Sequence, residues 1–282
     1  MTRWVDETLH DDVRLRLRAD RVLYDSQTPY QRVVIFKNGT FGRVMTLDGV
    51  IQTTEADEFI YHEMLTHVPI LAHGRARRVL IVGGGDGGML EEALKHASVE
   101  HVTMVEIDPG VIDLAKRHLS GICGRAFEDP RLNLVIADGV DFVADCADRF
   151  DVAIIDSTDP IGPGEALFTQ AFYAACKSCL APGGVLVTQN GVPFLQASEL
   201  TATMACLRPL FADATCYLAT VPTYAGGPMA FGWASDESGL RTTPIETLRA
   251  RFQAAAIETR YYTPEAHQGA FALPGYVAKL LA

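Results

Sequence analysis

Clustered positive charge is the feature that this sequence lacks most clearly. Lysine and arginine together number 24 against 35 aspartates and glutamates, which gives a net charge of −11 at pH 7. The most basic stretch, from Arg14 to Arg21, only alternates arginines along a strand-like segment. Nucleic-acid binding needs clustered cations that displace counterions, so we expect no nucleic-acid partner. The acidic balance favours a cationic substrate, although it also fits a simple role in solubility.

Long hydrophobic runs are missing as well. The apolar runs are short and interrupted, so we expect none to span a bilayer, and the charged residues 1–12 do not resemble a secretory signal. The CxxC pair Cys176 and Cys179 has no second pair or histidines at zinc-ligand spacing. We expect these thiols to pack on a helix rather than to form a redox pair. The expectation is a reduced, cytoplasmic protein without a metal ion or a membrane partner.

The first part of the chain is rich in strand signals. Its β-rich runs cover residues 13–18, 32–37 and 43–47. Asn38-Gly39, between the last two runs, is a hairpin turn signal. The length of 282 residues allows one large domain or two smaller ones. We therefore predict a small antiparallel β domain over residues 1–53 and a larger domain over residues 54–282.

A helix and then an alternating α/β pattern follow. Residues 54–57 resemble a capping box, and the apolar spacing predicts a helix from Glu58 to about His67, ending before Pro69. From Arg78 onward, short apolar runs alternate with helical segments, as in a parallel sheet covered on both faces. We expect parallel strands at 79–82, 102–105, 132–136, 152–155 and 185–187, and an antiparallel edge hairpin at 216–221 and 229–234. The predicted α/β fold resembles the Rossmann-like fold of S-adenosylmethionine-dependent transferases, with a mostly parallel seven-stranded sheet.

A glycine loop follows the first parallel strand. Gly83, Gly85 and Gly88 form a GxGxxG pattern that ends a strand and opens a helix, and such glycines let the backbone approach a ligand closely. Glu106, about twenty residues further along, suits hydrogen bonding to ribose hydroxyls. Asp86 inside the loop would repel a pyrophosphate and attract a sulfonium or an ammonium. The loop therefore favours a nucleoside cation over a dinucleotide.

Acidic residues also follow the other parallel strands. Asp138-Gly139 ends the third strand, Asp156 ends the fourth, and Asp159 lies in a Pro/Gly-rich loop that could act as a lid. Because the carboxyl ends of parallel strands meet at one crevice, we expect these acids to converge with Asp86 and Glu106. Like charges crowded together are unfavourable unless a cation binds among them. This clustering again indicates a cationic ligand.

With these residues the chain resembles the polyamine aminopropyltransferase family, in particular its bacterial spermidine synthases. The resemblance runs from about Trp4 to Val277. It depends on the joint order of linked motifs, which are Tyr30-Gln31, residues 47–52, Asp57 to Glu63, Gly83 to Gly88, Val105 to Asp108, Asp156 to Pro160 with Gly162-Pro163, Gln189-Asn190-Gly191, Pro222-Thr223-Tyr224 and Tyr261-Tyr262. One departure is Val192, where many members carry serine.

The resemblance implies a reaction and a set of site residues. An aminopropyl group would pass from decarboxylated S-adenosylmethionine, a co-substrate and not a cofactor, to putrescine, giving spermidine and 5′-methylthioadenosine. The implied donor site is Gln31, Gly83, Gly85, Glu106, Asp138, Gly139 and Pro163. The implied amine site is His62, Asp86, Asp156, Asp159, Gln52, Tyr61 and Tyr224, with Asp156 as the proton acceptor. The resemblance also implies a homodimer or a homotetramer.

Other functions remain open from the sequence. A methyltransferase on the same fold would explain the glycine loop and Glu106, but not Asp86 together with Asp156 and Asp159. A catalytically silent member would be expected to lose Asp156, and Asp86 argues against an NAD oxidoreductase. The acceptor is also undecided: cadaverine, agmatine, 1,3-diaminopropane or spermidine could replace putrescine, because one methylene changes binding by only about 1–3 kcal/mol.

Overall fold

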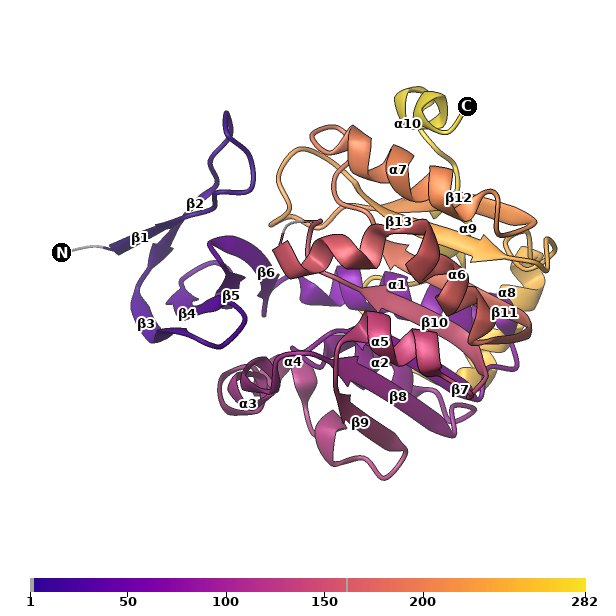
Figure 1. Cartoon of the computed structure of the whole chain (residues 1–282), viewed down its shortest axis with the longest axis horizontal. Coiled ribbons are helices and arrows are strands. Elements are labelled where there is room, and N and C mark those ends of the chain that lie inside the picture. Colours follow the sequence, from indigo (N-terminus) through magenta and orange to yellow (C-terminus); the bar gives the residue numbers. More distant parts are fainter. Residues whose placement is uncertain (1–2, 161) are drawn as a thin grey trace.

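The N-terminal part of the chain forms two small antiparallel sheets. The computed structural model describes residues 3–160 and 162–282, apart from the side chains of residues 162 and 163. One sheet has two strands, β1 (Arg3–Asp6) and β2 (Arg16–Ala19), and lies at one end of the molecule (Figure 1). The other is a meander of four strands, β3 (Arg21–Gln27), β4 (Arg32–Asn38), β5 (Gly42–Leu47) and β6 (Val50–Thr54). The predicted strand pair at 32–37 and 43–47 is confirmed as β4 and β5.

The β4–β5 turn shows why a glycine is needed there. Asn38 pairs with Gly42, so three residues connect the strands. The side-chain oxygen of Asn38 accepts hydrogen bonds from the backbone N–H groups of Thr40 and Phe41. Gly42 adopts a φ of 70°, a left-handed conformation that glycine reaches at little cost. The predicted alternation at 13–18 is only partly strand, because β2 begins at Arg16.

The larger part of the chain is built on one seven-stranded sheet of order β12-β13-β11-β10-β7-β8-β9. Its strands are β7 (Arg78–Gly83), β8 (His101–Glu106), β9 (Leu132–Ile136), β10 (Phe150–Asp156), β11 (Leu180–Gln189), β12 (Asp213–Ala219) and β13 (Met229–Ser235). The first five are parallel, and the last two form an antiparallel hairpin. The predicted sheet is confirmed, and β13 rather than β12 joins the hairpin to β11.

Helices cover both faces of this sheet because its strands are apolar on both sides. One face packs against α1 (Glu58–His73), α2 (Gly88–Lys95), α8 (Ile245–Ala255) and α9 (Pro264–Ala270). The other packs against α5 (Gly139–Asp145), α6 (Gln170–Ser178), α7 (Ala197–Leu207) and α10 (Gly275–Leu280). Along β7, for example, Val79 and Ile81 belong to the first core and Leu80 and Val82 to the second. This alternation is the period of two expected for a strand.

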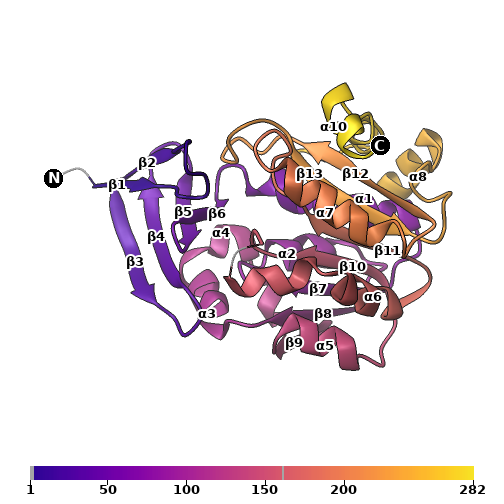
Figure 2. The same ribbon diagram turned by 45° about the horizontal axis from the view of Figure 1, so that its top comes forward.

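A third apolar cluster joins the small meander to the large sheet. Val33, Ile35 and Met45 of the meander pack against α3 (Pro109–His118) and α4 (Ser120–Cys123). Figure 2 shows α3 and α4 between the N-terminal strands and the large sheet. Short 3₁₀ turns, η1 (Ala126–Glu128) and η2 (Gly162–Phe168), complete the elements. The N-terminal strands are therefore fixed against the carboxyl ends of the central strands.

Helix α1 corrects two local predictions. It runs through Pro69 to His73 and ends at Gly74, whose left-handed backbone caps the helix, so the predicted end before Pro69 is wrong. Nearly every residue of α1 is buried, and this tertiary packing offsets the hydrogen bond lost at proline. The predicted capping box is also wrong: Asp57 makes no side-chain cap. Its carboxylate is used instead by the hydroxyls of Thr54 and Thr223 and by the Thr223 N–H.

The CxxC pair packs at the end of α6, as predicted. All six cysteines are free thiols, and Cys176 and Cys179 are buried on α6 and directly after it. Among residues 3–160 and 162–282, none of the helices combines the length and the apolar character that crossing a membrane requires.

Candidate active site

One cavity of about 410 Å³ lies at the carboxyl ends of the central parallel strands. It has the position that open α/β sheets use for ligands, and the N-terminal strands form its opposite wall. The predicted site residues that line it are Gln31, Gln52, Tyr61, His62, Gly83, Gly85, Asp86, Glu106, Asp138, Gly139, Asp156, Asp159 and Tyr224. Pro163 lies outside the described side chains. The structure thus brings together residues that span almost two hundred positions of the chain.

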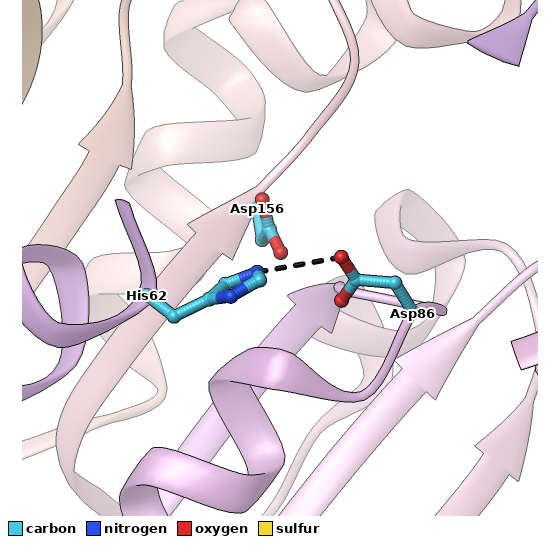
Figure 3. Close-up of side chains that lie close together, drawn as sticks. All are labelled: His62, Asp86 and Asp156. Carbon is cyan, nitrogen blue, oxygen red and sulfur yellow. Dashed lines mark ion pairs between the residues drawn. The ribbon is translucent and has the colours of Figure 1, made fainter. Parts of the chain in front are cut away.

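His62, Asp86 and Asp156 form a compact group in this cavity (Figure 3). His62 comes from α1, Asp86 from the loop between β7 and α2, and Asp156 from the end of β10. The Nε2 atom of His62 lies 3.4 Å from Oδ2 of Asp86, and one ligand atom of each residue lies within 4.8 Å of the others. Gly88 makes this possible, because a Cβ there would overlap the His62 ring.

The two aspartates of this group ionise differently. Burial opposes ionisation of Asp86, but the charge and hydrogen bond of His62 outweigh it and hold the pKa of Asp86 below its ordinary value. Burial, together with the charge of Asp86, raises the pKa of Asp156 to about 6. Neighbouring carboxyl groups with separated pKa values take different chemical roles. Asp86 is an anion at neutral pH, whereas Asp156 can gain and lose a proton near that pH.

His62 is an imidazolium in this arrangement. Burial alone would favour the neutral ring, but Asp86 and Glu58 together raise the pKa of His62 well above its ordinary value. Its Nδ1 lies 2.7 Å from Oε2 of Glu58, so both ring nitrogens face carboxylates. An imidazolium has two N–H donors and no lone pair for a metal ion. The group therefore suits an organic cation better than a metal ion.

Two tyrosines enclose the same end of the cavity. The Tyr61 hydroxyl donates a hydrogen bond of 2.5 Å to Oδ1 of Asp156. The Tyr224 hydroxyl donates to the backbone carbonyl of Gln52, also at 2.5 Å, and its ring packs edge-on against Tyr61. Gln52 thus orients Tyr224 through its main chain. These contacts leave Asp156 with a single hydroxyl donor and open space on the cavity side.

The glycine loop end of the cavity is lined by Glu106 and by the residues around it. Burial raises the pKa of Glu106 to about 7, although Oε1 accepts the backbone N–H of Asp108 at 2.9 Å. Asp108 in turn accepts hydrogen bonds from Thr28 and from Nε2 of Gln31. Asp138 caps α5 through one carboxylate oxygen. Carboxylate groups of Glu106 and Asp138 thus line this end of the cavity.

Asp159 lines the same cavity and is fixed by residues that the sequence did not reveal. Nε2 of Gln196 donates to Asp159 at 2.5 Å and to Glu199 at 3.0 Å. Burial raises the pKa of Asp159, and it raises that of Glu199 to about 8. No spacing pattern marks Gln196 or Glu199, because they follow β11 and meet Asp159 only in the fold.

Sequence reasoning missed other residues that line the cavity or contact its lining residues. Asp108 could have been found as an N-cap, since it directly precedes Pro109 at the first turn of α3. Glu7 and His10, from the loop between β1 and β2, line the cavity as well. No local signal places that loop over the sheet, because its position depends on the docking of the N-terminal strands.

Two family models match most of the chain, up to residue 243. The model for the spermine/spermidine synthase domain matches residues 58–243, and the model for the spermidine synthase tetramerisation domain matches residues 3–55. The chain belongs to the spermine/spermidine synthase family. The tetramerisation model covers both small N-terminal sheets, which agrees with an oligomeric assembly.

Relatives that match this chain over almost its full length carry the name polyamine aminopropyltransferase. One from Ruegeria sp. (strain TM1040) is 62% identical over 277 residues, covering 98% of each chain. Polyamine aminopropyltransferase 1 of Pseudomonas aeruginosa is 60% identical over 275 residues, covering 98% of this chain and 96% of the relative. The family and these relatives identify the chain as an aminopropyltransferase enzyme.

Solved structures of spermidine synthases share the fold. One, in complex with the transition-state analogue AdoDATO, is 39% identical with a TM-score of 0.93, and the match covers 100% of this chain and 96% of that one. The spermidine synthase of Thermotoga maritima is 37% identical with a TM-score of 0.90, and the match covers 100% and 95%. The predicted Rossmann-like fold with an antiparallel N-terminal part is confirmed for this family member.

Proposed function

We propose that this enzyme transfers an aminopropyl group from decarboxylated S-adenosylmethionine to putrescine, forming spermidine and 5′-methylthioadenosine. The observation that carries the proposal is the pair of unlike aspartates in one cavity. Asp86 is held as an anion by His62, and Asp156, with a pKa of about 6, is suited to accept a proton. This transfer needs an anion that attracts an ammonium and, beside that anion, a base that can deprotonate the ammonium.

Asp156 would act first, on the attacking amine. A primary amine has a pKa of about 10.4 and is protonated at pH 7, so it has no lone pair. The sulfonium beside it lowers the amine's pKa, and one ammonium proton passes to the Asp156 carboxylate. The Tyr61 hydroxyl holds that carboxylate in place.

The free amine would then displace the nucleoside. Its lone pair forms a C–N bond with the carbon next to sulfur while the C–S bond breaks, and that electron pair remains on sulfur. Methylthioadenosine therefore leaves as a neutral thioether, spermidine leaves with its new nitrogen protonated, and Asp156 releases its proton to water. No oxyanion develops, so most of the acceleration comes from aligning nitrogen, carbon and sulfur.

The two ends of the cavity would hold the two substrates. We assign the nucleoside donor to Gln31, Gly83, Gly85, Glu106, Asp138, Gly139 and Pro163. We assign the amine to His62, Asp86, Asp156, Asp159, Gln52, Tyr61 and Tyr224. S-adenosylmethionine carries a carboxylate that the decarboxylated donor lacks, and Asp86 would repel it, which favours the decarboxylated donor. In this proposal the reaction uses neither a metal ion nor a further cofactor.

The assembly would be a homodimer or a homotetramer formed through the N-terminal strands. The match of residues 3–55 to a tetramerisation domain supports this assignment. The mass of the purified enzyme by light scattering would decide between the two states. The cytoplasmic location stays a prediction from cysteine usage.

Product analysis by mass spectrometry tests the proposed reaction. The enzyme is given decarboxylated S-adenosylmethionine with an equimolar mixture of putrescine, cadaverine, agmatine, 1,3-diaminopropane and isotope-labelled spermidine, so that unlabelled spermidine can only be product, and a parallel sample receives S-adenosylmethionine. We expect methylthioadenosine and spermidine in the first sample and no product in the second. If another amine of the mixture is aminopropylated instead, that amine and not putrescine is the acceptor. S-adenosylhomocysteine in the second sample, without methylthioadenosine in the first, would make the enzyme a methyltransferase.

A further inference from the structure

Glu58 belongs to a buried row of three alternating charges. Its Oε2 lies 2.7 Å from Nδ1 of His62, and Nε2 of His62 lies 3.4 Å from Oδ2 of Asp86. The side chains of Glu58, His62 and Asp86 are 11%, 2% and 10% exposed. Glu58 does not line the cavity, whereas His62 and Asp86 do. The row therefore connects a residue outside the cavity to the amine site inside it.

The spacing on α1 produces this geometry. Glu58 and His62 are four residues apart, so their side chains lie on the same face of the helix. The absence of a side chain at Gly88 leaves room for the imidazole, because a Cβ there would overlap Cε1 and both ring nitrogens. The ring is thus held with one nitrogen towards each carboxylate, and its orientation does not depend on a substrate.

The charges of the three side chains show what Glu58 contributes. With Glu58 and Asp86 ionised and His62 protonated, the row carries one net negative charge. Without the charge of Glu58, a buried imidazolium would have only one ionised partner, at the longer of the two distances. A buried histidine with fewer anionic partners shifts towards its neutral form. Asp86 would then lose its cationic partner, and Asp156 would lose a nearby positive charge that favours its ionisation.

Other charged and titratable groups around His62 do not replace Glu58. Arg260, in the segment after α8, is a cation that lies 4.0 Å from Oε1 of Glu58, whereas Oε2 contacts the ring. The remaining groups near the row are Tyr61 on α1, Asp156 on β10, Tyr224 between β12 and β13, and Cys123 on α4. None of these four provides a second anion at Nδ1. The hydrogen bond of Glu58 is the contact described for that nitrogen.

We propose that Glu58 is a positioning residue of the transfer reaction, which keeps His62 in the imidazolium form and thereby leaves Asp86 paired and Asp156 free to take the amine proton. Its effect on turnover rests on the proposed function. Its effect on the charge of His62 does not, because that charge can be measured without any substrate.

The first test is a histidine NMR titration of the substrate-free enzyme. The eight histidines are labelled with ¹⁵N, and the His62 signal is assigned from its loss in His62→Gln. We expect Glu58→Gln, which keeps a hydrogen-bond acceptor but removes the charge, to lower the pKa of His62 by about 1 or more. The matched control is Glu91→Gln, which makes the same change on α2 at a half-exposed residue paired with Lys95. Equal titration of His62 in the wild type and in Glu58→Gln would overturn the proposal.

The second test is the pH profile of kcat/KM with decarboxylated S-adenosylmethionine and putrescine. In Glu58→Gln, the acid limb should move to higher pH by about half a pH unit or more, and activity should recover as the pH is raised. Glu91→Gln should keep the wild-type limb. Loss of activity by the same factor at every pH would show a purely structural role and overturn the proposal. If the wild-type enzyme is inactive on all the amines while Glu58→Gln still lowers the pKa of His62, the result would instead contradict the proposed function.

A conservative variant provides the test if circular dichroism shows that Glu58→Gln does not fold. Glu58→Asp keeps the charge but withdraws it from Nδ1. It should give a pKa of His62 between that of the wild type and that of a neutral substitution such as Glu58→Ala. A pKa of His62 in Glu58→Ala equal to that of the wild type would contradict the proposal.

Discussion

At the scale of single residues, the partners of two aspartates decide their chemistry. Asp86 and Asp156 line the same cavity, and both are buried. Asp86 faces an imidazolium, whereas Asp156 receives a hydrogen bond from a neutral tyrosine and faces the charge of Asp86. The environment, and not the residue type, therefore holds one as an anion and lets the other gain and lose a proton near neutral pH, as the proposed mechanism requires.

Replacing the proposed base, Asp156, should lower turnover but leave binding of the donor nucleoside almost unchanged. We expect Asp156→Asn to lower kcat by about 10²–10⁴-fold, because the amide cannot accept the amine proton. Binding of methylthioadenosine, measured by calorimetry, should change little, since Asp156 is assigned to the amine. The control is Asp148→Asn, at an exposed residue just before β10, whose other end carries Asp156. Near-normal turnover of Asp156→Asn would show that another group is the base.

The activity of the wild type should depend on the ionisation of Asp156. The carboxylate is the active form, so kcat/KM should rise with pH through about 6, the pKa of Asp156 in the free enzyme. Rates from pH 5 to pH 8 at low putrescine concentration measure this limb. A rate that is flat between pH 5 and pH 7 would not agree with a base of this pKa.

At the scale of elements, α1 holds the molecule together as well as the site. Its Glu63 is 1% exposed and accepts three backbone hydrogen bonds, from Arg260, Tyr261 and Tyr262, at 2.7–2.8 Å. This carboxylate binds the segment after α8 to the central helix. The Tyr261-Tyr262 motif therefore has a structural explanation in its main chain, and Tyr262 itself is buried in the core.

Removing that charge should weaken the whole fold. We expect Glu63→Gln to lower the free energy of unfolding by about 3 kcal/mol, because a neutral amide leaves buried N–H groups poorly satisfied. Urea unfolding at one fixed protein concentration measures the change. Glu265→Gln, at an exposed residue of α9 paired with Arg249, is the matched control and should change stability by under about 0.5 kcal/mol. An equally small loss in Glu63→Gln would mean that water satisfies these N–H groups.

At the scale of the whole molecule, three buried histidines limit stability in acid. Burial lowers the pKa of His67 and His96 to about 3 and that of His267 to about 4. Nδ1 of His67 and Nε2 of His96 lie 2.9 Å apart, which suits one shared proton and not two cations. Glu92, 3.0 Å from Nε2 of His67 and paired with Lys95, does not reverse this effect, because burial outweighs the charges around the ring. The folded protein thus keeps all three rings neutral.

The sign of the pH dependence follows from these lowered values. Below about pH 6.5 the unfolded chain binds protons at these histidines and the folded chain does not, so stability falls as the pH falls towards 4. Each histidine adds about 1.4 kcal/mol per pH unit to this slope. We expect His267→Gln to reduce the slope by about that amount, measured by urea unfolding between pH 6.5 and pH 4.5. A slope that stays the same in His267→Gln would show that the ring is protonated in the fold.

Local sequence patterns predicted the sheet well but predicted the helix ends poorly. The strands at 79–82, 102–105 and 152–155 were recognisable because a buried strand must be apolar on both faces. The end of α1 was not, since Pro69 is a strong local stop that dense packing overrides. The carboxylate of Asp57 likewise looked like a cap, yet it is used by Thr223, which lies 166 residues away. Such choices depend on competing partners that only the fold supplies.

The sequence by itself determined which strands form, that the glycine loop opens a helix, and that acidic residues gather at one sheet edge. These features depend on short-range periodicity and on the common direction of parallel strands. Only the tertiary structure decided that Tyr61 donates to Asp156, that Gln196 fixes Asp159, and that the ring of His62 lies between Glu58 and Asp86. The physical reason is that burial and neighbouring charge determine ionisation, and both depend on contacts between residues far apart in the chain.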